Sequence, residues 1–299
     1  MWKADVCIHH HPCDDGFAAA WVARRKWPEV VIIGTNYGQA FPDVDIAGKN
    51  VLIADFSYPP DVLSTLAQRA SSIVVLDHHK TGQSNLAGFT VELGEEERFD
   101  AARADRELSR LATLNRPAIA AHFDMQRSGA SLTWIFCFPD EPAPLFIRLI
   151  EDRDLWRMSL PETRAFSLFL KSYPYELDRW SWIADAISRT PDQVLAEAKA
   201  IERFYDRRIG EILPTATLQT IGRWKDIPVV HAPYAFGSDL ANALLSAYPS
   251  APFAAVVVDA YGARSYMLRS DDNRQDVSEV ARTFGGGGHR NAASFRVPA

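Results

Sequence analysis

Three short segments of the sequence hold the side chains best suited to bind divalent metal ions. They are HHHPCDDG at 9–16, IADFS at 53–57 and LDHHKT at 76–81. Each lies at the end of a short apolar run, so its carboxylates fall where a buried strand ends. A buried carboxylate is costly unless it is paired or bound to a cation. Mixed Asp and His ligands suit Mn²⁺, Fe²⁺, Co²⁺ or Zn²⁺, and such ions relieve the repulsion between converging carboxylates.

A fourth acidic segment, EDRDLW, lies on an expected helix further along the chain. Two helical positions differ by roughly 200° of rotation, so only one of Asp152 and Asp154 can face the site. We expect Asp152 to face it, with Arg153 and Asp154 as salt-bridge or solvent partners. Successive strand residues also point to opposite sides, so His78 and His79 should differ in role. One is expected to be a ligand and the other a wall of the site or a phosphate contact.

The elements that must position these residues alternate along the first part of the chain. Strands are predicted at 6–9, 30–34, 50–55 and 72–77, and helices at 16–27 and 59–70. Short apolar strands alternating with helices indicate a parallel sheet with crossover helices. Ligands of such sheets bind beyond the carboxyl ends of the strands, where Asp15, Asp55 and His78 fall. The sequence therefore predicts that these distant residues meet at one edge of the sheet.

The whole chain is predicted to be α/β, with two domains joined by a helix. Residues 1–190 form the parallel-sheet domain, in which the polar stretch 82–117 is interpreted as a solvated helical insertion without chemistry. The charged segment 191–213 is predicted to be a connector helix. Residues 214–299 form a smaller α/β domain with antiparallel strands, one hairpin of which turns at Tyr261-Gly262.

The segment FGGGGHRNAASF in the second domain is a candidate anion site. Glycines such as Gly286 and Gly287 let backbone N–H groups approach an anion, and His289 can add a charge-assisted bond. Arg269 and Ser270, at the end of a strand, are candidates for a second anion contact. The alternative is that the glycines only end a helix. No GxxxxGK[ST] or GxGxxG pattern supports an NTPase P-loop or a Rossmann dinucleotide site.

Composition narrows the class of protein and its partners. The 299 residues include 47% hydrophobic and 23% charged residues, with a net charge of −6. We therefore expect a globular protein without a basic surface for duplex DNA, and no apolar run reaches the roughly 20 residues of a membrane span. The three cysteines are odd in number and not in CxxC pairs, which favours a reducing cytoplasm over a disulfide framework.

The motifs together resemble a known superfamily. VLDHHKT resembles the signature of the DHH phosphoesterases, and FGGGGHRNAA resembles the motif of their DHH-associated C-terminal domain. HHHPCDDG, IADFS, RSGAS and EDRDLW are similar to the remaining motifs and occur in the same order. The resemblance covers nearly the whole chain except 82–117. It implies a DHH catalytic domain at 1–190 and a substrate-binding domain at 214–299.

The resemblance also implies roles for individual residues. Asp55 resembles the carboxylate that bridges two metal ions, and Asp77 the residue that orients His78. His79 resembles the non-ligand histidine near the phosphate. The implied metal ligands are His9 or His10 (ahead of His11), Asp15, Asp55, His78 and Asp152, and the implied substrate clamp is Arg269, Ser270, Gly286, Gly287 and His289.

One position departs from the pattern, because many members of the superfamily carry Asp where this chain has Cys13. A thiolate is a softer ligand than a carboxylate and favours Zn²⁺ or Fe²⁺ over Mn²⁺. Either Cys13 is a ligand and the metal preference shifts, or it is a bystander and one ion binds weakly.

The sequence as a whole predicts a hydrolase, specifically a manganese-dependent phosphodiesterase with two metal ions, for which Co²⁺, Fe²⁺ and Zn²⁺ are alternatives. Its expected substrates are short oligonucleotides or small phosphorylated nucleotides, as for an oligoribonuclease-like exonuclease. Two alternatives stay open: a phosphoanhydride hydrolase acting on polyphosphate or pyrophosphate, and a catalytically weak nucleotide-binding protein. The sequence does not distinguish RNA, DNA and cyclic-dinucleotide products, the cleavage polarity, or a monomer from a homodimer.

Overall fold

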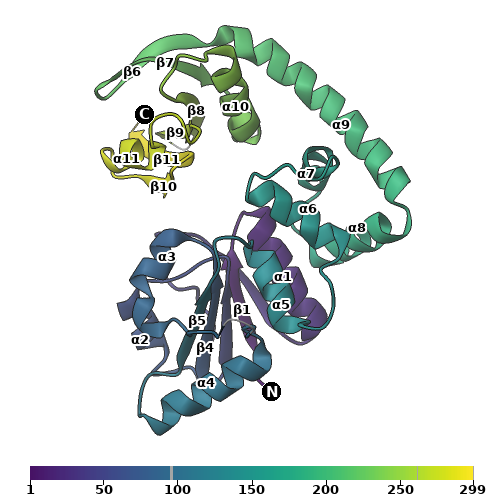
Figure 1. Cartoon of the computed structure of the whole chain (residues 1–299), viewed down its shortest axis with the longest axis vertical. Coiled ribbons are helices and arrows are strands. Elements are labelled where there is room, and N and C mark those ends of the chain that lie inside the picture. Colours follow the sequence, from purple (N-terminus) through teal and green to yellow (C-terminus); the bar gives the residue numbers. More distant parts are fainter. Residues whose placement is uncertain (95–96, 261, 299) are drawn as a thin grey trace. The chain divides into compact units, whose positions relative to one another are not determined.

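The computed structural model describes residues 1–94, 97–260 and 262–298. Within it the chain divides into two compact units, Met1–Glu202 and Arg203–Ala299 (Figure 1). Each unit has its own sheet and its own hydrophobic cores. The chain is therefore α/β, with a parallel sheet in the first unit and a mixed sheet in the second.

The sheet of the first unit has five parallel strands in the order β2-β1-β3-β4-β5. These are β1 (Val6–His10), β2 (Val31–Thr35), β3 (Asn50–Ala54), β4 (Ser72–Asp77) and β5 (Ile119–Phe123). From β1 the chain moves outward to β2 and then returns to β3 on the other side of β1. A reversal of this kind opens a crevice at the carboxyl ends of β1 and β3, the usual ligand site of such sheets.

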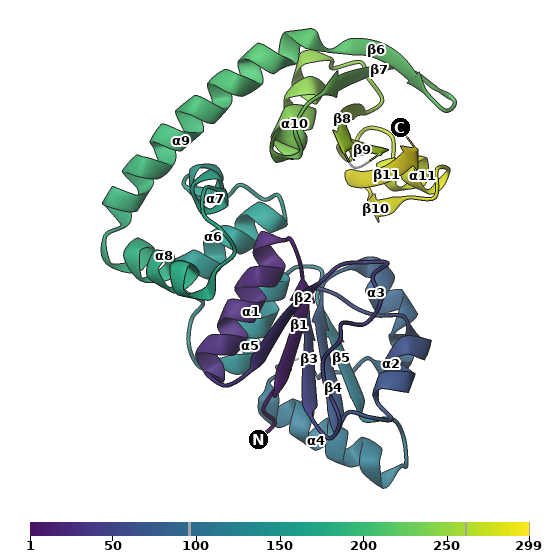
Figure 2. The same cartoon turned by 180° about the vertical axis from the view of Figure 1, so that it is seen from behind.

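Helices cover both faces of this sheet (Figure 2). On one face lie α1 (Asp14–Lys26), α4 (Ala101–Thr113), α5 (Gly129–Cys137) and α6 (Leu145–Asp154), followed by α7 (Thr163–Lys171) and α8 (Leu177–Arg189). On the other face lie α2 (Pro60–Leu66) and α3 (Lys80–Asn85), with a short 3₁₀ turn at Ala87–Phe89. Successive residues of a strand point to opposite faces of the sheet and so pack into different hydrophobic cores. Leu52 belongs to the core on the first face and Ile53 to the core on the second.

The stretch 82–117 is not a solvated insertion, and that prediction was wrong. It contains α4 and leads directly into β5, a strand that the sequence analysis did not recognise. Ala104, Leu108 and Leu111 on α4 are buried against the sheet. The helix is amphipathic, and its many charged residues hid the narrow apolar face that makes it the crossover between two parallel strands.

The second unit is built on a six-stranded sheet in the order β10-β11-β9-β8-β7-β6. Its strands are β6 (Thr217–Ile221), β7 (Trp224–His231), β8 (Ala254–Ala260), β9 (Ala263–Arg269), β10 (Gly287–His289) and β11 (Ala292–Pro298). Only the β7–β8 pair is parallel among the strands that the structure describes. Helices α10 (Gly237–Ala247) and α11 (Val277–Arg282) pack into separate cores, with 3₁₀ turns at Leu213–Thr215 and Tyr234–Phe236. Gly262 lies in the predicted hairpin with a φ of 72°, and Tyr261 lies outside the described residues.

The predicted charged helix is present as α9 (Pro191–Ile212). Its first half contributes Val194 and Ala198 to the core of the first unit, and its second half contributes Ile209 to a core of the second. The helix therefore contains the boundary between the two units. Among the residues that the structure describes, no helix combines the length and apolar character needed to cross a membrane.

Candidate metal centre

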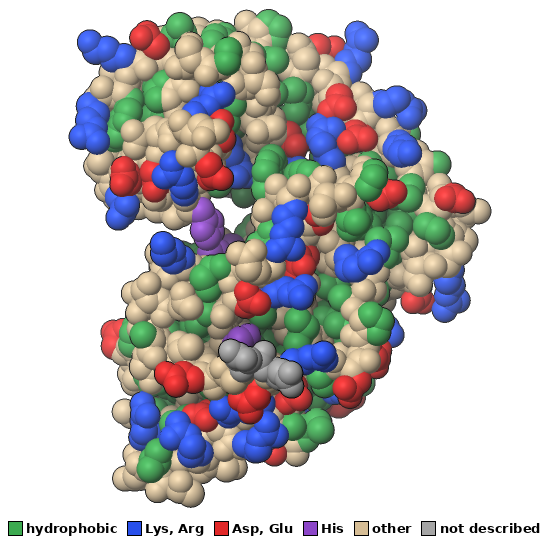
Figure 3. Space-filling view, viewed as in Figure 1, with side chains coloured by type: hydrophobic (Ala, Val, Ile, Leu, Met, Phe, Trp, Pro, Cys, Tyr) green, Lys and Arg blue, Asp and Glu red, His purple; other side chains and the backbone are tan. Residues whose placement is uncertain are grey.

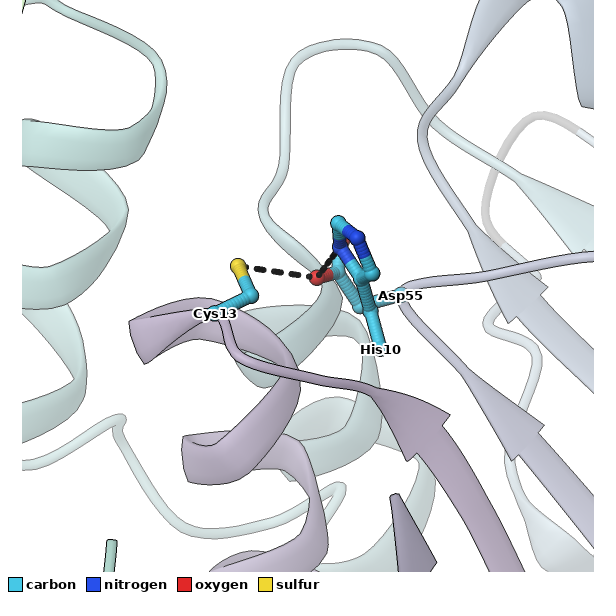
Figure 4. A group of neighbouring side chains, drawn as sticks. All are labelled: His10, Cys13 and Asp55. Atoms are coloured by element: carbon cyan, nitrogen blue, oxygen red, sulfur yellow. Dashed lines mark hydrogen bonds and ion pairs between the residues drawn. The ribbon is translucent and has the colours of Figure 1, made fainter. Parts of the chain in front are cut away.

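Asp55 lies at the centre of a cluster of ligating side chains where β3 ends. The residue is 1% exposed, and its two carboxylate oxygens face different neighbours. Oδ1 lies 3.1 Å from Nε2 of His78. Oδ2 lies 3.4 Å from Nδ1 of His10 and 3.4 Å from Sγ of Cys13 (Figure 4). The carboxylate therefore belongs to two groups of ligands at once.

The second of these groups surrounds the His78 ring. Nε2 of His78 lies 3.6 Å from Oδ2 of Asp154 and 3.9 Å from Oδ2 of Asp15. The ligand atoms of Asp15, His78 and Asp154 lie within 4.8 Å of one another. The same holds within the group of His10, Cys13 and Asp55 and within the group of Asp55, His78 and His79. Oxygen, imidazole nitrogen and sulfur converging in this way form a donor set that fits divalent transition metals.

The first turn of α5 holds Asp15 in place. The backbone N–H of Gly129 donates to Oδ2 of Asp15 at 2.5 Å, and that of Ala130 donates to Oδ1 at 3.0 Å. Ser128 caps the same helix by accepting from the N–H of Ser131. A helix N-terminus favours a carboxylate through its free N–H groups and its dipole, so Asp15 has a fixed orientation.

The cluster carries more negative charge than its buried surroundings tolerate. Burial, reinforced by the charges of Asp55 and Asp154, raises the pKa of Asp15 well above its usual value. Burial also raises the pKa of Asp154 to about 6. For His78 burial alone would lower the pKa, but a hydrogen bond to Asp55 and the nearby carboxylates outweigh it and raise the pKa to about 10. Bound cations would relieve this crowding of carboxylates.

Comparisons with known proteins identify the fold of this chain. No protein-family model matches the chain. A solved DHH domain, from a member of a family of ribosomal proteins, superposes with a TM-score of 0.52. The match covers 98% of this chain and 82% of that one, at 12% sequence identity. This chain has the DHH fold. At such low identity the likeness concerns the fold alone.

Two further proteins are similar to this chain. A pGpG-specific phosphodiesterase from Vibrio cholerae gives a TM-score of 0.47 and 11% identity, over 98% of this chain and 93% of that one. The uncharacterized protein R106 of Acanthamoeba polyphaga mimivirus is 29% identical over 315 aligned positions, which cover 98% of this chain and 67% of R106.

Asp77, His78 and His79 are the three residues after which the DHH fold is named, and each has different surroundings in this chain. Asp77 is fully buried, and its Oδ1 lies 2.6 Å from Nδ1 of His79. The same oxygen accepts the backbone N–H groups of His78, at 2.8 Å, and His79, at 3.2 Å. Asp77 therefore contacts His78 through its backbone, and the ring that it orients directly is that of His79.

The structure corrects the predicted choice between Asp152 and Asp154. The ligating residues around Asp55 are called the DHH cluster below; they are His10, Cys13, Asp15, Asp55, His78, His79 and Asp154. Asp152 turns away from the DHH cluster and accepts hydrogen bonds from Ser159 N and Oγ, Leu160 N and Thr163 Oγ1. Its carboxylate thus organises the turn that follows α6. Asp154, at the last position of the helix, reaches His78 instead. Only one of the two faces the cluster, as helix geometry requires. That residue is Asp154 and not the predicted Asp152.

Among the three adjacent histidines, His10 is the one that joins the DHH cluster. His9 is 2% exposed, packs against Phe17 and places Nδ1 2.9 Å from the carbonyl of His10. Successive residues of β1 point to opposite sides of the sheet, so His9 and His10 cannot both reach Asp55. The ring of His11 packs against Tyr175. His9 is therefore removed from the expected ligands.

The residues predicted to clamp an anion lie in the second unit, and only some of them meet. Arg269 and Gly287 line a pocket of about 200 Å³ together with Ser238, whose Oγ accepts from Arg269 at 3.1 Å. The other three predicted residues, Ser270, Gly286 and His289, do not line that pocket.

The first two glycines of this segment end α11, and the other two belong to β10. The N–H of Gly285 donates to the carbonyl of Arg282 at 3.1 Å, and the N–H of Gly286 donates to that of Ala281 at 2.9 Å. Gly285 has a φ of 75°, which favours glycine at the end of a helix. The prediction that Gly286 offers its N–H to an anion was therefore wrong, and the alternative of a helix cap describes this position.

Tyr37 is a neighbour of the DHH cluster that the sequence did not reveal. Its ring centroid lies 5.4 Å from that of His10 and 5.8 Å from that of His79, and the residue is 46% exposed. It lies in a loop after β2 without a recognisable motif, so no sequence signal pointed to it. Its place beside two histidines makes it a wall of the site.

We expect Gly129→Ala to disrupt the metal centre. A Cβ at this position would lie 2.5 Å from Cβ of Asp55 and 3.0 Å from Oδ2 of Asp15, so both carboxylates must move. Mn²⁺ affinity, measured by calorimetric titration, should fall by about 10-fold or more, as for groups that support metal ligands. Gly88→Ala is the matched control, because its added Cβ meets no atom within 4 Å. Equal affinities in the two variants would contradict the tight packing of Gly129 against the cluster.

Proposed function

We propose that this protein is a metal-dependent phosphodiesterase that hydrolyses short oligonucleotides or small phosphorylated nucleotides. The observation that carries the proposal is the division of the Asp55 oxygens between His10 and Cys13 on one side and His78 on the other. A carboxylate shared between two divalent ions is the characteristic element of two-metal phosphoryl transfer.

The protein's own residues would hold and surround such a pair of ions. His10, Cys13 and Asp55 would bind one ion, and Asp15, His78 and Asp154 the other. Asp55 would reach the second ion as well, through the oxygen that lies 3.1 Å from His78. When bound, the ions supply charge neutralisation on the phosphoryl group and an activated water at neutral pH. The N–H groups of Gly129 and Ala130 keep Asp15 fixed, so its carboxylate needs no rearrangement during turnover.

His79 is suited to bind a non-bridging phosphate oxygen. Its side chain is 19% exposed, and Asp77 holds the ring by Nδ1, which fixes the direction in which Nε2 points. Burial alone would lower the pKa of His79, but the hydrogen bond to Asp77 and its charge raise it above the usual value. A cationic imidazole at this place would donate a charge-assisted hydrogen bond to the substrate.

Charge supports a small substrate over a long duplex. The net charge is −6, and on the face shown in Figure 3 the Lys and Arg side chains are scattered among acidic ones. Duplex-binding proteins usually gather such residues into a basic stripe. The pocket that contains Arg269 and Gly287 is of a size for one end of a short nucleotide.

The roles that we propose for the parts of the chain are those expected from the sequence. Residues 1–190 would form the DHH catalytic domain, 191–213 the connector and 214–299 the substrate-binding domain. All three cysteines are free thiols, which supports a reducing compartment such as the cytoplasm.

A substrate panel tests the proposal. We expect dinucleotides and pAp to be hydrolysed faster than longer oligomers and polyphosphate when Mn²⁺ is present. Faster hydrolysis of polyphosphate would instead identify a phosphoanhydride hydrolase. Nucleotide binding without metal-stimulated turnover would identify a nucleotide-binding protein, and would contradict the proposed activity.

Cys13 should set the metal preference of this enzyme. Because thiolate is softer than carboxylate, we expect Cys13→Asp to raise the ratio of kcat/KM with Mn²⁺ to that with Zn²⁺ by about 10-fold. The measurement is a metal titration of wild type and variant on the same dinucleotide. Cys137→Ala, a change of a buried cysteine outside the cluster, serves as the control. An unchanged ratio in Cys13→Asp would show that the thiol does not bind the metal.

A further inference from the structure

The first unit contains a cavity that is separate from the metal centre. It has a volume of about 450 Å³ and lies between α5 and the segment that precedes α4. Among its lining residues are Phe99, His122, Ser131, Trp134 and Phe138. None of the residues lining it belongs to the groups of possible metal ligands found among the described residues. Its size falls in the range of roughly 300–1,000 Å³ that is typical of small-molecule sites.

Two polar side chains in this cavity have hydrogen-bonding capacity that the protein does not use. Ser131 is only 3% exposed, and within the described part of the chain its Oγ has no hydrogen-bond partner. The ring nitrogens of His122 have none either, over the same residues. Burial lowers the pKa of His122, so the ring is neutral and offers one donor and one acceptor. The buried hydroxyl of Ser131 would usually have a partner, which points to a ligand, whereas His122 is half-buried.

The walls of the cavity are flat aromatic surfaces. The ring of Phe99 lies 5.3 Å from that of His122 at an interplanar angle of 32°. The ring of Trp134 lies 4.7 Å from that of Phe138 at 33°. The rings pack on one another, and Phe99 and Trp134 are only 2% and 4% exposed, so together they give the cavity an apolar aromatic lining that suits a flat ligand.

The charges around the cavity disfavour an anion. Its two arginines already have partners: Arg98 donates to the carbonyl of Pro139, which also lines the cavity, at 2.7 Å, and Arg127 donates to Glu151 at 3.4 Å. Three carboxylates also line the cavity, those of Glu97, Asp124 and Glu141. A ligand with a phosphate would meet this negative charge, whereas a neutral ligand would not.

We propose that this cavity binds a neutral, planar nitrogen heterocycle of the size of a purine nucleoside. Ser131 and His122 would supply the specific hydrogen bonds, and the aromatic walls would supply the buried contact area. This site goes beyond the proposed phosphodiesterase activity and does not depend on it.

Calorimetric titration of the metal-free full-length chain tests the site, because chelation of metal ions leaves the DHH cluster without its cofactor. The probes are adenosine and guanosine, each compared with its 5′-monophosphate. We expect saturable binding of at least one nucleoside with a stoichiometry of one. Absence of nucleoside saturation at millimolar concentration would overturn the proposal, and so would a monophosphate that binds more than tenfold tighter and loses that affinity in Ser131→Ala, because the tighter binding would then lie in this cavity.

Two variants locate the binding. Ser131→Ala and His122→Phe should each weaken binding by about tenfold, the effect expected for losing one buried hydrogen bond. His231→Phe, a change of an exposed histidine in the second unit, is the matched control and should bind as wild type does. Urea unfolding confirms that the variants are folded, and Ser131→Ala, which removes a single atom, decides the outcome if His122→Phe does not fold. Unaltered affinity in Ser131→Ala would place any binding elsewhere and refute the site.

Discussion

Asp55→Asn is expected to lower kcat/KM for metal-dependent hydrolysis by more than about 100-fold. Loss of a group that merely supports a metal ligand costs about 10- to 100-fold in affinity or activity, and Asp55 contacts both candidate ion sites directly. Asn keeps one oxygen but removes the charge and the second acceptor, so it cannot serve two cations.

The Asn variant is also expected to fold. Asp55 has a φ of 56°, in the left-handed region that Asn and Asp tolerate better than other residues with a side chain. The measurements are kcat/KM on a dinucleotide with Mn²⁺ and Mn²⁺ affinity by calorimetric titration. Asp45→Asn, at an exposed position, is the matched control. Activity of Asp55→Asn within tenfold of wild type would contradict a shared carboxylate.

The neighbouring acids of α6 should give opposite results when each is changed to the amide. Asp154→Asn is expected to reduce activity by more than about 100-fold, since Asp154 lies 3.6 Å from His78 in the cluster. Asp152→Asn should leave Mn²⁺ affinity close to that of wild type. It should instead lower the free energy of unfolding by about 1–3 kcal/mol, because an amide cannot accept from every donor that Asp152 now satisfies.

Each member of this pair is the control for the other, since they share a helix, a charge and a substitution. Urea unfolding and Mn²⁺ titration are to be measured on both. Loss of Mn²⁺ affinity in Asp152→Asn but not in Asp154→Asn would reverse the assignment and restore the choice first made from the sequence.

The positions of the strand-end residues could be predicted because they follow from general rules. Apolar runs fixed the strands, parallel pairing placed their carboxyl ends together, and Asp15, Asp55 and His78 then had to meet. The choice between Asp152 and Asp154 could not be made in this way. Helix geometry excludes one of them, but the phase of the helix depends on which side packs against the sheet.

Two other predictions failed because the deciding partners are distant or in the backbone. The apolar face of α4 becomes visible only when Leu108 and Leu111 are seen against the sheet. The N–H groups of Gly285 and Gly286 could serve an anion or a helix end, and carbonyls of the preceding helical turn engage them first. A glycine run alone does not distinguish these uses.

Because each unit buries cores of its own, the two can lose their structure at different temperatures. A cation that binds only the native first unit would raise the melting point of that unit and leave the other where it was. A heat-capacity scan with and without manganese would then show one peak that moves and one that stays, a record of where the ion binds that needs no substrate at all.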